Sequence, residues 1–383
     1  MPTQAEIIEG FLQSGLLQRP VERIDTHSAI VLLSGDRAIK IKRQIQFPFL
    51  DYSTLERRRR ACESEIQINQ RFAPEIYKQV IPIRRDPTGR FYFGGQIGDV
   101  VEWAIEMRRF DQDDILENVI AREGMSLLLA RKVAEAIQNA HAEAPVSDTE
   151  TWLGSLLSFI KSNDTELKTF DDLFPSQRVQ ALTDRSLSLY ENLRPTLRRR
   201  GNAGLVRQCH GDLHLANVVM IAGKPTLFDA LEFDPSMAAG DVMYDLAFLL
   251  MDLINIGQVK AANMVLNDYL IRSDHLLRFA GLAALPLFMS FRAAIRAKVS
   301  VARMSVVPRE KQFLWKIRAL SYFELAERLL RPCQAALIGV GGLSGSGKSV
   351  LACGIAPDFL PQPGAILLRS DVERKSMFGG GSD

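Results

Sequence analysis

The feature that most constrains this chain is a run of eight residues, His210 to Asn217, which reads HGDLHLAN. Within it, Asp212 and Asn217 stand five positions apart, and an apolar stretch leads on to Phe228 and Asp229. A carboxylate, an amide ligand and a second carboxylate after the next strand are the groups that hold metal-bound ATP against a hydroxyl. The run therefore predicts phosphoryl transfer.

Composition argues against several other classes of protein. The net charge of +2 does not indicate a nucleic-acid partner. The four cysteines are scattered without a CxxC pair, which favours reduced thiols in a cytoplasmic protein over a disulfide framework or a zinc site. The first ten residues lack the basic and apolar leader of a signal peptide. The most apolar run, Phe279–Phe291, is shorter than the roughly 20 residues of a membrane span, so we expect a core helix and no membrane partner.

The first hundred residues have the pattern of a mostly antiparallel sheet with one helix. Two apolar runs, 29–33 and 38–42, flank a turn at Gly35 and predict a hairpin. Thr54 is a candidate cap for a helix over 53–72. Further strands are expected at 82–93, 100–107 and 206–227. Helices are expected at 125–142, 152–162, 176–199, 241–256 and much of 259–331, with Gly201 ending the third of them.

The three polar residues of the opening pattern have distinct expected roles. Asp212 would accept the proton of the attacking hydroxyl or orient that hydroxyl. Asn217 and Asp229 would ligate Mg²⁺, which prefers hard oxygen ligands together with phosphate oxygens. ATP and Mg²⁺ are therefore the expected cofactors.

A lysine on an upstream strand should hold the ATP phosphates, braced by a glutamate on a helix. Lys40 fits this position and Glu65 is the candidate brace, with Glu63 a weaker alternative. Because side chains alternate along a strand, Lys42 lies on the same face as Lys40, and the pattern leaves both as candidate phosphate ligands. No GxGxxG loop occurs between residues 20 and 40, so the short turn at Gly35 would cover the phosphates.

These residues resemble the aminoglycoside phosphotransferase and choline kinase group of protein-kinase-like enzymes. The group's loop is HGDLHxxN, which matches residues 210–217 here. Its metal-binding aspartate lies in a short apolar strand, which corresponds to residues 227–229. The pattern GDxxxDLA often follows in the group and occurs here at 240–247. The resemblance covers about residues 20–330 and is most specific at 208–247. It implies a two-lobed kinase-like fold with ATP in the cleft.

Other polar residues of this region are expected to support the loop. We interpret Asp241 and Asp245 as hydrogen-bond acceptors that brace it, and His210 as a structural residue. His214 is a candidate to line the substrate side. The remaining histidines carry no pattern and receive no role: His27, His141 and His275.

A second phosphate-binding pattern follows Arg331, where the helical pattern of the sequence ends and a short buried-strand pattern begins. Residues 342–349 read GLSGSGKS, a complete GxxxxGK[ST] loop between an apolar run at 335–340 and an apolar helix pattern. Its backbone N–H groups would cradle phosphates, Lys348 would reach the outer phosphates and Ser349 would ligate Mg²⁺. The glycines that shape this loop are Gly342, Gly345 and Gly347.

This C-terminal part resembles small P-loop kinases of the gluconate and shikimate kinase type. In that group, the segment that follows the next strand touches the acceptor. Here the strand is expected at 365–368, and the segment after it carries Asp371 as a candidate acceptor contact. The alternative role for Asp371 is that of a helix cap. Fewer residues follow the loop than the roughly 100 of a complete domain, so we expect an incomplete domain without phosphotransfer activity of its own. The order of the two motifs resembles bacterial bifunctional aminoglycoside phosphotransferase/ATP-binding proteins.

The acceptor is expected to be a small molecule, and charge gives one indication of its nature. Arg292, Arg296 and Arg303 recur near helical spacing, with Lys298 beside them. A polycationic aminoglycoside favours an acidic pocket, so this basic helix favours a neutral or anionic acceptor; a solvated helix face is the alternative. The acidic run at 111–114 is interpreted as a loop and helix cap, or as a site for a cationic acceptor.

Together these patterns predict an α+β chain with a two-lobed protein-kinase-like fold, followed by a partial α/β P-loop NTPase segment. The expected domains are 1–107, 108–331 and 332–383. The favoured function is that of a cytoplasmic ATP-dependent phosphotransferase acting on a hydroxyl of a small molecule. The alternative is a nucleotide-binding regulatory or scaffold module without turnover. The absence of an APE motif argues against a kinase that acts on proteins, and the oligomeric state stays open.

Overall fold

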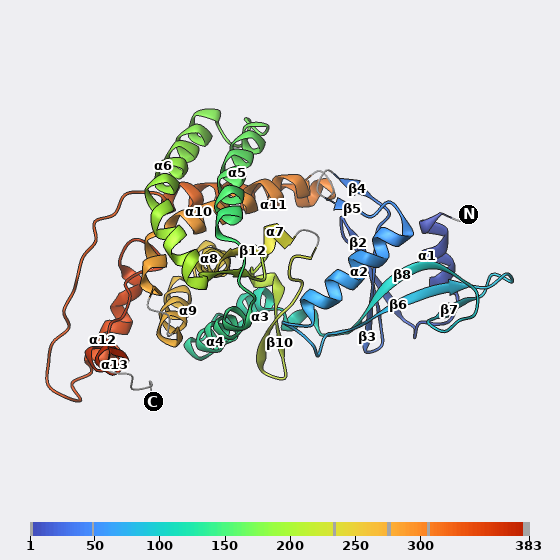
Figure 1. The fold of residues 1–383 in the computed structure, drawn as a ribbon, viewed down its shortest axis with the longest axis horizontal. Helices are drawn as coiled ribbons and strands as arrows, with labels where there is room; N and C mark the ends of the chain where they lie inside the picture. The colour runs from blue at the N-terminus through green and yellow to red at the C-terminus, as the bar shows by residue number, and fades with distance from the viewer. Residues whose placement is uncertain (1–2, 48–49, 233–234, 274–276, 305–306, 378–383) are drawn as a thin grey trace. The chain divides into compact units, whose positions relative to one another are not determined.

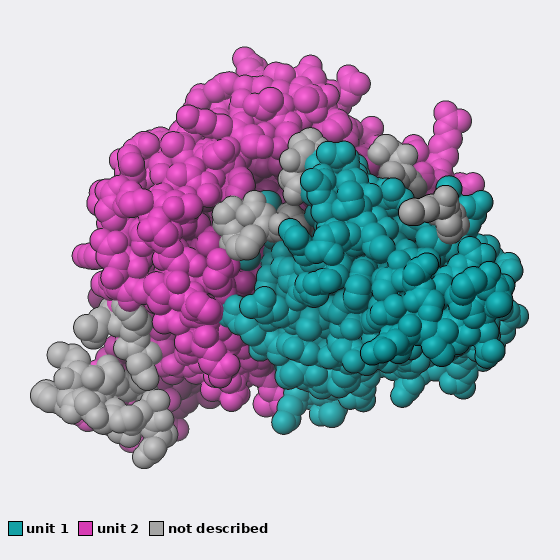
Figure 2. Space-filling view, turned by 45° about the vertical axis from the view of Figure 1, so that its right-hand side comes forward, with its two compact units in different colours: residues 1–118, 216–238 teal, residues 119–215, 239–383 magenta. Residues whose placement is uncertain are grey.

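The computed structural model describes residues 3–47, 50–232, 235–273, 277–304 and 307–377. The chain divides into two units (Figure 2). Unit 1 comprises residues 1–118 and 216–238, and unit 2 comprises residues 119–215 and 239–383. The loop His210–Asn217 therefore begins in unit 2 and ends in unit 1. The expected domain boundaries near 107 and 331 stay predictions.

Unit 1 is built on a six-stranded antiparallel sheet with the order β1-β2-β3-β8-β6-β7 (Figure 1). Its strands are β1 (Val21–Asp25), β2 (Ala29–Ser34), β3 (Arg37–Lys42), β6 (Tyr77–Arg85), β7 (Phe91–Phe93) and β8 (Asp99–Arg108). A separate short pair consists of β4 (Gln46–Phe47) and β5 (Leu50–Asp51). The hairpin predicted over 29–42 is confirmed, since Ala29 pairs with Lys42 and Ser34 pairs with Arg37.

Two helices complete the first part of unit 1: α1 (Gln4–Gln13) and α2 (Leu55–Asn69). The second confirms the helix predicted over 53–72. It begins after Thr54 because the side chain of Thr54 accepts a hydrogen bond from the N–H of Arg57 and so satisfies a free helix donor. The face of α2 that carries Cys62 and Glu65 is buried.

A second hairpin, β10 (Val218–Ile221) and β11 (Lys224–Leu227), also belongs to unit 1. Its Val219 is fully buried in one apolar cluster with Cys62 and Tyr77, and this burial fixes the hairpin to the sheet and α2. Because Val218 pairs with Leu227, the residues just before β10 and just after β11 lie at one end of the hairpin. That end carries Asn217 and Asp229. A short helix, α7 (Pro235–Ala238), follows.

Unit 2 is mainly helical, and its helices confirm those predicted at 125–142, 152–162, 176–199 and 241–256. They are α4 (Leu127–Glu143), α5 (Thr149–Lys168), α6 (Ser176–Arg200), α8 (Val242–Asn255), α9 (Val259–Arg272), α10 (Leu285–Met304) and α11 (Arg309–Leu329). Helix α3 (Leu116–Glu123) begins in unit 1 and ends in unit 2. The short strands β9 (Val206–Gln208) and β12 (Ala239–Asp241) pair antiparallel and hold the start of the loop beside the start of α8. None of the described helices is both long and apolar enough to span a membrane.

Two local predictions in unit 2 need correction. A π-helical turn, Gly201–Leu205, continues from α6, and the left-handed backbone falls at Gly204, with φ 80°. Gly201 is required for space instead, because a Cβ there would lie 2.4 Å from the side chain of Thr149. The apolar run Phe279–Phe291 is divided between a 3-10 turn, Phe279–Ala283, and α10, because Pro286 favours the first turn of a helix over its interior.

The C-terminal residues depart most from the prediction. Within the described part of 332–383, helices α12 (Lys348–Ile355) and α13 (Ser370–Met377) and a 3-10 turn, Ala356–Asp358, form, but the strands expected at 335–340 and 365–368 do not. A strand needs a partner for its N–H and C=O groups, and no described strand pairs with either run. Leu337 is accordingly 93% exposed. The partial α/β P-loop fold is therefore not confirmed.

Part of this C-terminal segment is nonetheless attached to α9. The C=O of Ala365 accepts hydrogen bonds from Nδ2 of Asn263 at 3.0 Å and of Asn267 at 3.2 Å. The N–H of Leu367 donates to Oδ1 of Asn267 at 2.7 Å. Two buried amides thus satisfy the backbone groups that a neighbouring strand would satisfy in a sheet.

Candidate functional site

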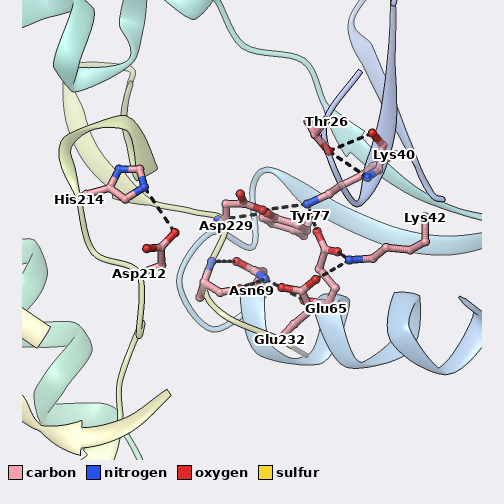
Figure 3. Close-up of polar contacts among 12 residues, drawn as sticks. Thr26, Lys40, Lys42, Glu65, Asn69, Tyr77, Asp212, His214, Asp229 and Glu232 are labelled. Carbon is pink, nitrogen blue, oxygen red and sulfur yellow. Dashed lines mark hydrogen bonds and ion pairs between the residues drawn. The ribbon is translucent and has the colours of Figure 1, made fainter. Parts of the chain in front are cut away.

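Five charged side chains of unit 1 form one group, here called the charge cluster: Lys40, Lys42, Glu65, Asp229 and Glu232 (Figure 3). Nζ of Lys40 donates to Oε1 of Glu65 at 2.7 Å and to Oδ1 of Asp229 at 2.8 Å. Lys42 pairs with the other carboxylate oxygen of Glu65 and, at 2.5 Å, with Oε1 of Glu232. Strand β3 supplies both lysines, α2 supplies Glu65, and the segment after β11 supplies the other two carboxylates.

Exposure distinguishes the two lysines. The Lys42 side chain is 1% exposed and that of Glu65 is 0% exposed, whereas the Asp229 side chain is 46% exposed. The Lys40–Asp229 side of the charge cluster is therefore open to solvent, and the Lys42 side is enclosed. A soluble ligand can reach the first pair but not Lys42.

Lys40, Lys42 and Glu65 stabilise one another's charges. Burial disfavours the charged lysines, but the adjacent carboxylates outweigh it, so the pKa of Lys40 and the pKa of Lys42 are both raised above the ordinary lysine value. Burial likewise acts against the Glu65 carboxylate, but Lys40 and Lys42 lower the pKa of Glu65 below its ordinary value. These three groups are therefore charged at neutral pH.

The backbone at Asp229 is held in the left-handed region, with φ 58°. For a residue with a Cβ this conformation costs about 1–3 kcal/mol and persists only where the surroundings fix it. Tyr77 accepts the N–H of Asp229 through its hydroxyl at 3.2 Å, and Asn69 accepts the N–H of Ala230 at 2.7 Å. These two contacts fix the turn that directs the Asp229 carboxylate at Lys40.

The start of the His210–Asn217 loop is held by Asp245 of α8. Its carboxylate accepts the N–H of His210 at 3.2 Å and that of Gly211 at 2.8 Å. Nε2 of His141 on α4 lies 3.1 Å from the same carboxylate, and Nδ1 lies 2.8 Å from the hydroxyl of Tyr269. The predicted bracing by Asp245 is confirmed, and His141, which the sequence left without a role, is part of the brace.

His141 and Asp245 also lie close to Cys209, with their ligand atoms within 4.8 Å of one another. This group does not have the character of a metal site. Both ring nitrogens of His141 are engaged by Tyr269 and Asp245. Burial raises the pKa of the Cys209 thiol, which disfavours the thiolate that a metal requires.

Asp241, the other aspartate of the GDxxxDLA pattern, has a different role from the predicted loop brace. Its two carboxylate oxygens each accept a hydrogen bond from Arg200 at 2.7 Å. It also caps α8 by accepting the N–H of Met243 at 2.8 Å. The Arg200 side chain is 1% exposed and that of Asp241 is 0% exposed, so this ion pair lies in the interior of unit 2.

Replacement of Asp241 by Asn should destabilise the protein by about 3–5 kcal/mol, because it leaves the Arg200 guanidinium buried without its counter-charge. The measurement is the free energy of unfolding in urea. The matched control is Glu150→Gln, which removes a bidentate pair with Arg198 at the surface and should cost much less. Equal losses from the two variants would contradict the interior role of Asp241.

Asp212 and His214 face one another within unit 2 (Figure 3). Nε2 of His214 lies 3.4 Å from Oδ2 of Asp212, and the His214 ring packs edge-on against Phe248. Loss of hydration raises the pKa of Asp212, but His214 and then Arg296 lower it more, so the pKa of Asp212 falls below its usual range. Asp212 therefore carries a full negative charge at neutral pH.

The structure brings together several of the predicted site residues. Lys40, Lys42, Glu65 and Asp229 share the charge cluster, and the N–H of Phe228 donates to the C=O of Asn217, which keeps Asn217 at the Asp229 end of the hairpin. The weaker candidate Glu63 instead pairs with Arg59 on the exposed face of α2. Asp212 belongs to unit 2, and His275 lies outside the described residues.

The predicted P-loop residues form a curled turn before α12. The backbone has positive φ at Gly342, Gly345 and Gly347, which is the glycine-dependent shape expected of the loop. Nζ of Lys348 donates to the C=O of Leu343 within the same turn. Ser349 lies in the first turn of α12. A glycine-rich turn and the helix after it are present without the strand that was expected before them, and the assignment of the turn as a phosphate-binding loop stays a prediction.

Sequence reasoning missed Asn69, Tyr77, His141 and Asp252 and assigned no role to Glu232. Of these, only Glu232 has a local signal, because it lies three positions after Asp229 on a segment already identified. The contact of His141 with Asp245 spans 104 positions and that of Asn69 with Ala230 spans 161. No spacing pattern within the sequence reports such pairs.

Two uncharacterized proteins, from Mycobacterium bovis and Mycobacterium tuberculosis, are each 30% identical to this chain over 340 residues. The matches cover 87% of this chain and 64% of each relative, so the chain spans less than two thirds of the length of the relatives it matches.

Three solved structures are similar at low identity. One is the GDP complex of aminoglycoside 2'-phosphotransferase-IIIa, at 14% identity and a TM-score of 0.45, covering 85% of this chain and 99% of that one. A choline/ethanolamine kinase family protein from Mesorhizobium loti is 14% identical with a TM-score of 0.44, covering 83% and 94%. A ternary complex of a thermostable aminoglycoside phosphotransferase mutant with AMP-PNP and hygromycin B is 13% identical with a TM-score of 0.48, covering 83% and 97%.

A family model described as "Phosphotransferase enzyme family" matches residues 111–282. The match contains the loop with Asp212 and Asn217, the hairpin that ends at Asp229, and the brace residue Asp245. Residues 111–282 are thus similar to the phosphotransferase enzyme family, and this similarity supports a phosphotransferase.

Proposed function

We propose that this protein transfers the γ-phosphate of ATP to a hydroxyl of a small molecule. The observation that carries the proposal is the charge cluster, in which Lys40 contacts both Glu65 and Asp229. A phosphate-binding lysine, its helix glutamate and a metal-binding aspartate are the groups that phosphoryl transfer requires on the nucleotide side. The family match of residues 111–282 supports the same reaction class.

On the nucleotide side, Lys40 is assigned to the ATP phosphates and Glu65 to the bracing of Lys40. Solvent exposure supports this choice, because Lys40 shares the open side of the charge cluster with Asp229 while Lys42 is enclosed. When phosphate binds, its charge replaces that of Asp229 beside Lys40, and Asp229 is then available for the metal. Lys42 is assigned a structural role in holding Glu65 and Glu232.

Asn217 and Asp229 are the residues that would hold Mg²⁺. An amide oxygen and a carboxylate oxygen at one end of the β10–β11 hairpin make a hard-oxygen donor set, which suits this ion. Bound Mg²⁺ neutralises negative charge on the phosphates as they react. The fixed turn at Asp229 supports the assignment, because it orients the carboxylate before any ligand arrives.

Asp212 is assigned to the acceptor hydroxyl. Its depressed pKa makes it a weak base but keeps it ionised, so its role is to orient the hydroxyl through a hydrogen bond and to accept the proton late in the transfer. Asp245 and His141 hold the loop that presents Asp212, and they act as positioning residues.

We further propose that the loop of residues 342–349 binds a second nucleotide phosphate group. The curled shape at Gly342, Gly345 and Gly347 and the start of α12 at Lys348 support this assignment. Lys348 would contact the phosphate and Ser349 would ligate Mg²⁺. Because the strand before this loop does not form, the segment is assigned no transfer activity.

The function is tested by incubating the full chain with ATP, Mg²⁺ and a pool of hydroxylated metabolites. We expect acceptor-dependent ADP formation together with a new phosphate ester detected by mass spectrometry and ³¹P NMR. ADP formation without any phosphate ester, or unchanged by the acceptor pool, would reject the transferase in favour of a nucleotide-binding module. Omission of Mg²⁺ should abolish the product.

A further inference from the structure

Helix α10 carries two arginines whose surroundings differ from the solvated face that the sequence allowed. The Arg292 residue is only 6% exposed, and Arg296, one turn later, is half-buried. Within the described residues, the Nε atoms of both side chains are buried and have no hydrogen-bond partner. The same described residues place no carboxylate within 4.0 Å of either guanidinium, whereas the buried Arg200 of unit 2 pairs with Asp241.

Arg292 is connected to Asp212 by a short series of contacts. Its guanidinium lies over the Tyr244 ring at 3.9 Å and over the Phe248 ring at 4.7 Å. Phe248 in turn packs against His214 at 5.3 Å between ring centroids, and His214 lies 3.4 Å from the Asp212 carboxylate. The aromatic rings hold the guanidinium in place through cation–π contacts, and its Nε–H has no hydrogen-bond partner within the described residues.

Arg296 is linked to the same loop through Tyr322 of α11 and Asp252 of α8. Its guanidinium lies 5.6 Å from the centre of the Tyr322 ring. The Tyr322 hydroxyl donates to Asp252 at 2.7 Å, and the other oxygen of Asp252 accepts the N–H of Leu215 in the loop. Burial lowers the pKa of Arg296, but Asp252 raises it more, with Tyr322 and Asp212 adding to the effect.

A buried guanidinium without an ion-pair partner, as at Arg292, is costly, because desolvation of a charge is offset only by a close counter-charge and hydrogen bonds. At Arg296 the carboxylates of Asp252 and Asp212 offset this cost from beyond ion-pair distance, but its Nε–H has no hydrogen-bond partner within the described residues. Guanidinium N–H groups match the two oxygens of a carboxylate or phosphate. A cationic acceptor beside the same residues would add a repulsion. The two arginines therefore have the character of an anion site beside the hydroxyl-orienting carboxylate.

We propose that the acceptor is an anionic hydroxy compound, a hydroxy acid or a phosphorylated polyol, held by Arg296 and Arg292 with its hydroxyl at Asp212. This inference rests on the proposed transferase function. In the reaction the acceptor hydroxyl oxygen forms the new P–O bond, the bond from the γ-phosphorus to ADP breaks, and the hydroxyl proton passes to Asp212 and then to solvent. Carboxylate and phosphate acceptors share this chemistry and are separated by the test.

The first experiment compares pairs of acceptors in which one member carries an anionic group that the other lacks, using the full chain with ATP and Mg²⁺. The pairs are glycerate and glycerol, gluconate and glucose, and glycerol 3-phosphate and glycerol, with kanamycin as a cationic acceptor. We expect the anionic member of at least one pair to be phosphorylated roughly 10- to 100-fold faster than its neutral partner, from the gain of hydrogen bonds between charged groups. Equal rates within every pair, or phosphorylation of kanamycin alone, would overturn the proposal.

The variant Arg296→Gln should remove this preference, and Arg296→Lys should retain part of it. The matched control is Arg303→Gln, which makes the same charge change in the last turn of α10. It should leave the preference unchanged. Circular dichroism of each variant separates loss of the anion site from loss of the fold. An Arg296→Gln protein that is folded and keeps the full preference would contradict the proposal.

A binding measurement separates this inference from the proposed function. Gluconate, glycerate, glycerol 3-phosphate and inorganic phosphate are added to the wild type and the variants, and the shift in thermal midpoint is compared with that from glucose. Stabilisation by an anion that Arg296→Gln loses supports the anion site even where no phosphate ester forms, and the missing ester then rejects only the transferase. Transfer to neutral or cationic acceptors that depends on Asp212 but not on Arg296 rejects the anion site and retains the transferase.

Discussion

Replacement of Asp212 by Asn should lower kcat by about 10²- to 10⁴-fold, the range for loss of a positioned proton acceptor. Asn keeps the size of the side chain but removes the charge that faces His214 and that we assign to the acceptor hydroxyl. KM for ATP should change little, because the ATP phosphates are assigned to unit 1. The measurement is the initial rate of phosphate ester formation at saturating ATP. Asp172→Asn, at an exposed position of unit 2, is the matched control and should retain the wild-type rate.

The pH dependence of the same reaction gives an independent check. The pKa of Asp212 is depressed in the folded protein, so the stability that its charge contributes is present above the unfolded value of about 3.9 and is lost as pH falls through the folded pKa. Asp212 therefore stays ionised from about pH 5 to pH 8. The kcat profile should show no acid limb from this group in that window. A limb near pH 6 that disappears in Asp212→Asn would contradict the assignment.

Much of the charge cluster was predictable because local patterns specify it. The alternation at 38–42 put Lys40 and Lys42 on one face, and the cap at Thr54 fixed the phase of α2, which turns Glu65 and not Glu63 inward. The run that ends at Asp229 gave the fourth member. Spacing alone could not separate the two lysines, since their difference lies in burial by residues far away in the sequence.

The failures have a common physical cause. The apolar run at 335–340 has the composition of a buried strand, but a strand forms only when a neighbour satisfies its backbone groups, and no described strand does so. The His141–Asp245 contact similarly depends on the packing of α4 and α8, which no local pattern encodes. Local signals predicted motifs and helices, while tertiary partners decided which groups acquired a role.

The two lysines of the charge cluster give the second large expected effect. Lys40→Met should lower kcat/KM for ATP by about 10²- to 10³-fold, the range for loss of one positioned donor to transition-state charge. Its effect on the free energy of unfolding should be smaller than that of Lys42→Met, because Glu65 still has Lys42 as its ion-pair partner and Asp229 is open to solvent. The measurements are steady-state kinetics and urea unfolding on the same preparations.

Lys42→Met should show the opposite result, a large loss of stability with a small effect on kcat/KM. Lys42 is enclosed and contacts both Glu65 and Glu232, so its removal leaves buried negative charge and should cost about 3–5 kcal/mol of unfolding free energy. The folded fraction of Lys42→Met should retain kcat/KM within about tenfold, since the enclosed ammonium does not meet the nucleotide. Lys42→Arg, which keeps the charge, provides a second variant where the Met protein unfolds.

The two variants together decide which lysine binds phosphate, because each serves as the control for the other. Both remove one ammonium from the same strand face two residues apart, so a general loss of positive potential would affect them equally. A large kinetic loss in Lys42→Met with a small one in Lys40→Met would transfer the phosphate role to Lys42. Such a result would also require the enclosed side of the charge cluster to open when ATP binds, and hydrogen exchange of α2 with and without ATP would detect that opening.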